Sequence, residues 1–146
     1  MDKASLLRLI KEKLSEKIEN FEKLISETRA SANDTKSSMG DKYETGREML
    51  QQEINNLQVQ LNEILKQKDF LKTILPKPTD KADKGAIVKT DRGLFFISVS
   101  LGEIKIDHEK IICISPESPL AKAMNGKLKN EVFSINNINQ KIENIW

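Results

Sequence analysis

The chain has 146 residues, 38% of them hydrophobic, 5% aromatic and 32% charged. This length allows one ordinary domain, or a small domain plus an extended element. The composition favours the second, because its hydrophobic and aromatic content is low for a single compact core. No apolar run approaches the ~20 residues of a membrane span, and no signal peptide opens the sequence. The single cysteine excludes an internal disulfide, so we expect a cytoplasmic protein.

The net charge of the chain is only +2, and neither half concentrates charge of one sign. Residues 1–75 hold 13 basic and 13 acidic side chains, and residues 76–146 hold 11 and 9. Nucleic-acid binders usually gather Lys and Arg on one face, because phosphate contacts supply most of their affinity. We therefore expect a protein partner, without sequence-specific nucleic-acid binding and without membrane binding.

The first half of the chain carries two apolar stripes with helical spacing. The first stripe contains Leu7, Ile10, Leu14, Ile18, Phe21, Ile25, Thr28 and Ala32. The second contains Tyr43, Leu50, Ile54, Leu57, Leu61, Ile64 and Leu71, with Lys68 as its polar break. Steps of three and four residues predict helices over 3–34 and 40–75 that pair through one seam. The short polar connection favours an antiparallel hairpin over 1–75 in a monomer, although periodicity alone also allows a helical dimerisation rod.

The second half of the chain shows strand patterns instead. Pro76 and Pro78 are expected to end the second helix and to begin a polar linker over 76–84. Beyond it, short apolar segments are separated by turn residues, and they predict strands over 85–90, 93–100, 103–106, 110–114, 131–135 and 140–146. Residues 85–146 are therefore expected to form a small α+β domain with one short helix.

The short helix is expected within Ile114–Lys127, which reads ISPESPLAKAMNGK. Ser118 is a suitable N-cap, Pro119 suits the first helical turn, and Gly126 can adopt the left-handed conformation that ends a helix. This segment resembles the end of the C-terminal domain of the Gre transcript-cleavage factors of bacterial RNA polymerase. The positions that fit that family's pattern are Ile114, Ser115, Ser118, Pro119, Leu120, Ala121, Lys122, Ala123, Met124, Gly126 and Lys127.

The resemblance implies a divergent Gre-type factor with an FKBP-like C-terminal domain. Such a factor docks on core RNA polymerase through that domain and inserts its hairpin into the secondary channel, where it modulates elongation or transcript cleavage without being an enzyme itself. The residues that the resemblance assigns to docking are Ser115, Pro116, Ser118, Pro119, Leu120 and Lys122.

The hairpin tip resembles the family's acidic tip motif, G-D-L-x-E-N-A-E-Y-x-x-A-[RK]-E, in two alternative registers. One register matches Gly40, Asp41 and Glu44, which would give two carboxylates able to share a magnesium ion with the polymerase active site. The other matches Tyr43 and the pair Arg47–Glu48, and it places Lys36 and Met39 at the acidic positions. The first register implies stimulated cleavage, and the second implies a factor that only occupies the channel. Asp41 also suits a plain structural role in a first helical turn.

Other candidate chemistry is weaker. Cys113 lies in the run IICI, which reads as a buried strand, and His108 lies in a polar turn, so a nucleophile–base pair is not expected. Phe95 and Phe96 should point to opposite faces of one strand, which would leave one of them exposed for a partner. Two other functions stay open. One is a chaperone-like or prolyl-isomerase-like client-binding protein, and the other is an interaction protein that dimerises through its helices.

Overall fold

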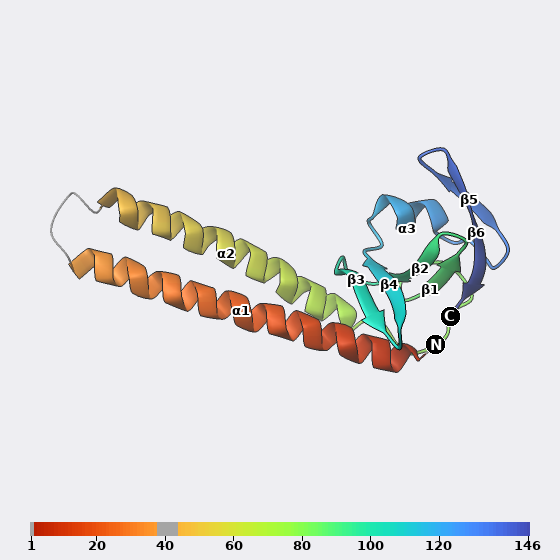
Figure 1. The fold of residues 1–146 in the computed structure, drawn as a ribbon, viewed down its shortest axis with the longest axis horizontal. Coiled ribbons are helices and arrows are strands. Elements are labelled where there is room, and N and C mark those ends of the chain that lie inside the picture. Colours follow the sequence, from red (N-terminus) through yellow and green to blue (C-terminus); the bar gives the residue numbers. More distant parts are fainter. Residues whose placement is uncertain (1, 38–43) are drawn as a thin grey trace. The chain divides into compact units, whose positions relative to one another are not determined.

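The computed structural model describes residues 2–37 and 44–146, and it describes side chains from 2–33 and 46–146. Two long helices come first, and six strands follow, with a short third helix between the fourth and the fifth strand (Figure 1). The expected α+β class is confirmed. The chain divides into two compact units. One contains residues 12–68, and the other combines residues 1–11 with 69–146. The sequence-based domain boundaries differ from this division at residues 1–11 and 69–75, and as limits of independently folding parts they stay a prediction.

The helical unit is built from most of α1 (Lys3–Ser37) and α2 (Glu44–Leu71). Its core is a cluster of apolar side chains that recur at helical spacing on both helices: Ile18, Phe21, Ile25, Ile54, Leu57, Leu61 and Ile64. These are the predicted seam positions: Ile18, Ile25, Ile54 and Leu61 are buried, and Phe21, Leu57 and Ile64 are partly buried against them within one chain. A dimerisation rod would need this seam to be exposed, so the observed packing favours the intramolecular hairpin.

The start of α1 belongs to the other unit and is fixed by polar contacts. The Asp2 carboxylate accepts hydrogen bonds from the backbone N–H groups of Ala4 and Ser5, at 3.1 and 3.3 Å, and so caps the helix. Bonding from Ser5 lowers the pKa of Asp2. Lys3 is 5% exposed, and its ammonium donates to the carbonyls of Lys77 (2.7 Å) and Trp146 (3.1 Å).

The second helix ends earlier than the prolines predicted. Its last helical residue is Leu71, and residues 72–74 continue in tight turns in which each N–H bonds to the carbonyl three residues before it. The hydroxyl of Thr73 donates to the carbonyl of Phe70 at 2.6 Å, which offers the backbone an alternative to helical bonding. The last helical residue therefore lies five positions before Pro76.

The sheet has the strand order β3-β4-β2-β1-β6-β5. Its strands are β1 (Ile87–Thr90), β2 (Gly93–Ile97), β3 (Gly102–Ile106), β4 (Glu109–Ile114), β5 (Val132–Ile135) and β6 (Ile138–Ile145). All neighbours are antiparallel except β2 and β4, which run parallel. Each predicted strand is present, with bounds that shift by a few residues.

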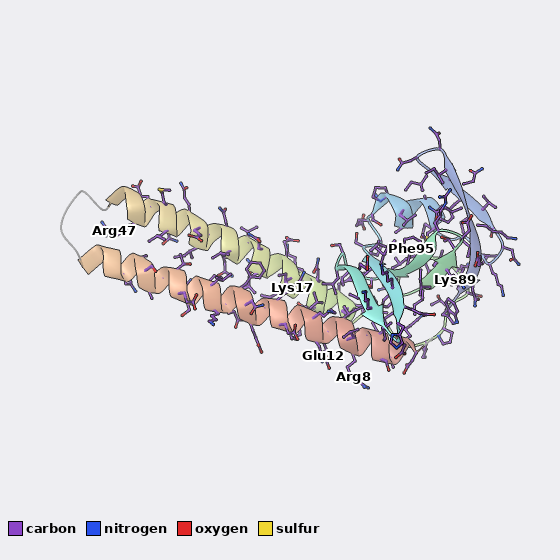
Figure 2. All side chains as sticks on the ribbon, in the orientation of Figure 1. Arg8, Glu12, Lys17, Arg47, Lys89 and Phe95 are labelled. Atoms are coloured by element: carbon purple, nitrogen blue, oxygen red, sulfur yellow. The ribbon has the colours of Figure 1, made fainter. Side chains whose placement is uncertain are left out.

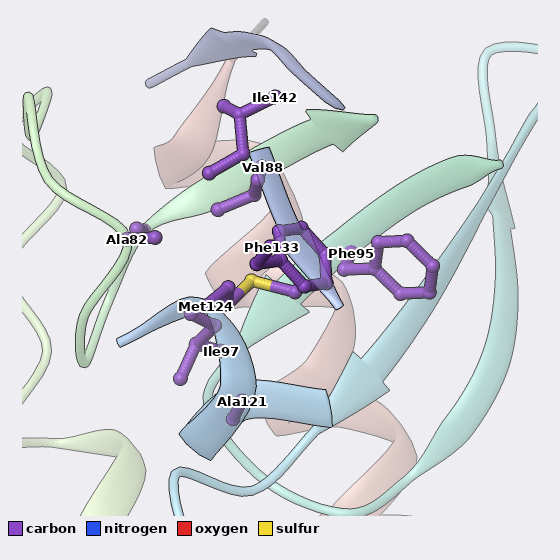
Figure 3. Close-up of a cluster of buried hydrophobic side chains, with 9 residues drawn as sticks. Ala82, Val88, Phe95, Ile97, Ala121, Met124, Phe133 and Ile142 are labelled. Atoms are coloured by element: carbon purple, nitrogen blue, oxygen red, sulfur yellow. The ribbon is translucent and has the colours of Figure 1, made fainter. Parts of the chain in front are cut away.

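The short helix α3 (Pro119–Met124) covers one face of this sheet. Figure 3 shows the cluster that joins them, in which buried side chains converge from β1, β2, α3, β5 and β6. Its buried members are Ala82, Ala86, Val88, Phe95, Ile97, Ala121, Met124, Phe133 and Ile142.

Phe95 and Phe96 differ from the sequence-based expectation in one respect. Phe95 belongs to the cluster beneath α3, and Phe96 is on the opposite face because successive strand residues alternate. The prediction that one ring is exposed is wrong, since the two residues are 6% and 0% exposed. The sheet is covered on both faces, so Phe96 packs in a second apolar layer with fully buried residues such as Ile87 and Ile111 on its own face.

Candidate functional site

The candidate site is the segment from the end of β4 through α3 to Gly126. The chain leaves the sheet at Ile114, whose carbonyl accepts from the N–H of Ser98 at 2.7 Å. A turn follows, closed by a bond from the N–H of Ser118 to the carbonyl of Ser115 at 3.1 Å. The segment is thus anchored to β2 at its first residue and makes its own backbone turn before the helix begins.

Ser118 and Pro119 start α3 as their residue types predict. Ser118 has extended backbone angles, and its hydroxyl accepts from the N–H of Ala121 at 3.2 Å. Pro119 occupies the first helical position, where a missing N–H breaks no helical bond. The N–H of Lys122 bonds to the Ser118 carbonyl at 3.0 Å, which completes the first turn.

Gly126 ends the segment and ties it back to the chain before β1. Its φ of 76° is in the left-handed region, which an L side chain rarely adopts. Its N–H donates to the carbonyl of Ala82 at 3.0 Å, and the N–H of Ala82 donates to the carbonyl of Lys127 at 2.9 Å. This reciprocal pair fixes the exit of the helix, so α3 is held at both ends.

The segment separates its side chains into an inner and an outer set. Ala121 and Met124 are buried in the core cluster, and Leu120 and Ala123 pack partly against it. Of the residues assigned to docking, Pro119 and Lys122 are exposed, and Ser115, Pro116 and Ser118 are partly exposed. Glu117 is also exposed, beside Pro116. The sequence analysis did not single it out, although a charged residue in a turn between two prolines is a signal of a surface position.

The tip residues cannot be placed in the same way. Asp41 and Met39 lie outside the described residues, as do the side chains of Glu44 and Lys36. Among the residues that the structure describes, no three His, Cys, Asp or Glu side chains come together as a metal site would require. The ion site of Asp41 and Glu44 therefore stays a prediction.

His108 and Cys113 have the structural roles expected of them. His108 is exposed, with a φ of 67°, in the turn between β3 and β4. Cys113 is buried in β4, and burial raises its pKa to about 12, so at neutral pH it is a thiol and not a thiolate. A thiol in that state is a poor nucleophile.

Two solved structures are similar to this chain over at least 92% of its length. No protein-family model matches the sequence, and no curated protein matches it. Its structural neighbours are Gre-factor homologues. GreA factor homolog 1 (Gfh1) of Thermus thermophilus is similar over 93% of this chain and 94% of its own, with 18% identity and a TM-score of 0.39. A second structure, of the transcription factor Gfh1, is similar over 92% of each chain, with 16% identity and a TM-score of 0.38.

The part of the chain that the structure describes contains no helix that is both long and apolar enough to span a membrane.

Proposed function

We propose that this chain is a Gre-like factor that docks on core RNA polymerase through the outer face of its α3 segment. The observation that carries the proposal is the segment Ile114–Lys127, in which the residues of the family pattern have separate structural and surface tasks. Ser118 and Gly126 fix the ends of α3, and Ala121 and Met124 hold it on the core. Pro116, Glu117, Pro119 and Lys122 are left partly or fully exposed, available to a partner.

The helical unit supports the second part of the proposal, which is entry into the secondary channel. Residues 12–37 of α1 belong to this unit, and at ~1.5 Å per residue this part of the helix is about 40 Å long. The hairpin buries its apolar seam within itself and leaves polar side chains such as Glu22 and Lys23 outside. Such an arm can enter a water-filled channel without losing its own packing.

In this proposal the chain has no catalytic residues of its own, and any RNA cleavage is carried out by the polymerase. The tip decides whether the factor stimulates that reaction. Asp41 and Glu44 would help to hold a magnesium ion in the first register, whereas a tip presenting Lys36 and Met39 would occupy the channel without adding a ligand. We favour channel occupation, because the register that includes Tyr43 keeps the following helix in step without a slip.

The docking test uses the full chain and core RNA polymerase in a pull-down. Lys122→Glu reverses a charge on the outer face of α3 and should weaken binding several-fold, because like charges at an interface are unfavourable. Lys129→Glu is the matched control, since Lys129 is also exposed in the same unit but lies outside the segment. Equal binding by wild type and both variants would remove α3 from the interface, and no binding by wild type would refute the proposed function.

The tip test measures cleavage of RNA in stalled elongation complexes. Stimulation by wild type that is lost in both Asp41→Asn and Glu44→Gln, with binding intact, would establish the metal-holding register, because an amide lacks the charge that magnesium requires. Channel occupation predicts a different result. Wild type and both variants should leave cleavage unstimulated and should compete equally with an authentic cleavage factor.

A further inference from the structure

A second surface of the sheet unit has the features of a binding site and is separate from the α3 segment. It is a pocket of about 510 Å³ lined by Lys89, Thr90, Gly93, Leu94, Glu109, Lys110 and Trp146. Gly93 and Glu109 are the first residues of β2 and β4. Ile114, where the α3 segment begins, is the last residue of β4. The pocket and the α3 segment therefore lie at opposite ends of that strand.

The central wall of the pocket is the face of the sheet that α3 does not cover. Val88 and Phe95 pair across β1 and β2 and face the α3 cluster, so their neighbours Lys89 and Leu94, which also pair, point to the other face. Trp146 exchanges two backbone hydrogen bonds with Ile87, at 3.1 and 2.9 Å, which places it beside β1. An ammonium, an aliphatic side chain and a partly exposed indole thus share one pocket.

Three charged residues line the pocket, Lys89, Lys110 and Glu109, which gives its lining a net charge of +1. Lys110 lies 3.7 Å from Glu103, so its ammonium already has a carboxylate partner. The hydroxyl of Thr90 donates to Gln140 at 3.0 Å and accepts from the N–H of Arg92, so it is occupied too. Lys89 is exposed and forms no ion pair with any of the described residues. It is shown on the sheet unit in Figure 2.

An irregularity in the sheet sets the position of Lys89. The register between β1 and β6 shifts between Lys89 and Thr90, where Lys89 pairs with Asn144 and Thr90 pairs with Ile142. One residue of β6 is therefore left without a partner, as in a β-bulge. Bulges bend a strand and redirect the side chains beside it, and they are frequent next to binding sites.

We propose that this pocket binds an acidic peptide segment of a protein partner, with a carboxylate side chain on Lys89 and a neighbouring apolar side chain against Leu94 and Trp146. One free ammonium matches one carboxylate, and Glu109 on the rim disfavours a multiply charged anion. The lining lysines and Glu109 are exposed, whereas sites for small molecules bury most of the ligand around a few precisely placed polar groups. An open pocket of this size suits one or two side chains of a partner whose remaining surface rests on the rim.

The test uses the full chain and the fluorescence of Trp146, which is the only tryptophan in the sequence. The probe is acetyl-Leu-Glu-Leu-Glu-Leu-amide, which should change the emission of Trp146 in a saturable way. Two matched peptides separate the contributions: replacing both Glu by Gln removes the charge, and replacing every Leu by Ser removes the apolar side chains. Both should bind more weakly than the probe.

Lys89→Gln should weaken binding of the probe about two- to fivefold, the range of an exposed ion pair. Lys129→Gln makes the same change in net charge away from the pocket and should leave binding unchanged. The proposal is overturned by an absence of saturable change with wild type, by equal binding of the Gln peptide, or by equal effects of the two lysine variants. Isovalerate serves as a free carboxylate with an apolar body. If it binds as tightly as the probe, the pocket is a small-molecule site and the peptide proposal is wrong.

Discussion

Replacing Met124 by Ala should strongly destabilise the sheet unit, because this side chain joins α3 to the sheet. Met124 is fully buried in a cluster with Val88, Ile97 and Phe133 among its members. Truncating a buried Met to Ala typically costs about 2–5 kcal/mol, from lost burial and from the cavity left behind. Against a total unfolding free energy of ~5–15 kcal/mol for a domain, that loss is large.

The measurement is urea unfolding followed by Trp146 fluorescence, which reports on the unit containing Met124. With a denaturant slope of about 1–3 kcal/mol per molar, the midpoint should fall by roughly 1–3 M. Met124→Leu keeps the volume and should cost less than ~1.5 kcal/mol. Leu128→Ala is the surface control, because Leu128 is 43% exposed and should lose within about 0.5 kcal/mol. A loss below ~1 kcal/mol for Met124→Ala, or an equal loss at Leu128, would refute the packing described for α3.

Three further predictions concern single features. Ser118→Ala should lower the unfolding free energy by about 1 kcal/mol in the same urea assay, because the N–H of Ala121 loses its acceptor; an unchanged midpoint would show that this cap is not stabilising. Ile54→Asp should reduce helical circular dichroism by burying an unpaired charge in the hairpin core, whereas Val59→Asp, at a position 62% exposed, should not; equal spectra would contradict the seam. Burial raises the pKa of Cys113 from its ordinary value of 9.0 to about 12. The unfolded chain therefore loses this proton first, so the stability of wild type relative to Cys113→Ala should fall as the pH rises from about 9 towards 12; a constant difference across that range would argue against the burial.

The fold was largely predictable because its patterns are local. Steps of three and four residues identified Ile18, Ile25, Ile54 and Leu61 as one seam, and these are the residues found packed together. The start of α1 was less predictable. Leu7 was assigned to the seam, but Leu6 is the fully buried neighbour, and both belong to the compact unit that contains the sheet. No periodicity within a helix can reveal that its two ends have different partners.

The candidate site was predictable in part for the same reason. Ser118, Pro119 and Gly126 have conformational preferences that act within a few residues, so the sequence was enough to place α3. The pocket at Lys89 was not foreseen. It depends on a sheet register that brings β1, β2 and Trp146 together from separate parts of the chain. The charges at positions 89 and 109 gave no signal of that proximity.

The division of the chain also has a kinetic consequence. Residues 1–11 belong with 69–146, so the 57 residues of the helical unit are an insertion between two parts of one compact unit. Closing a flexible loop of that length costs roughly 3–4 kcal/mol of chain entropy by the logarithmic rule. A preformed hairpin brings its own two ends together and removes most of that cost. We therefore expect the hairpin to form first and to hold the two parts of the sheet unit close together in the chain. A variant with a weakened seam should then refold its β-sheet more slowly, even though no strand has been altered.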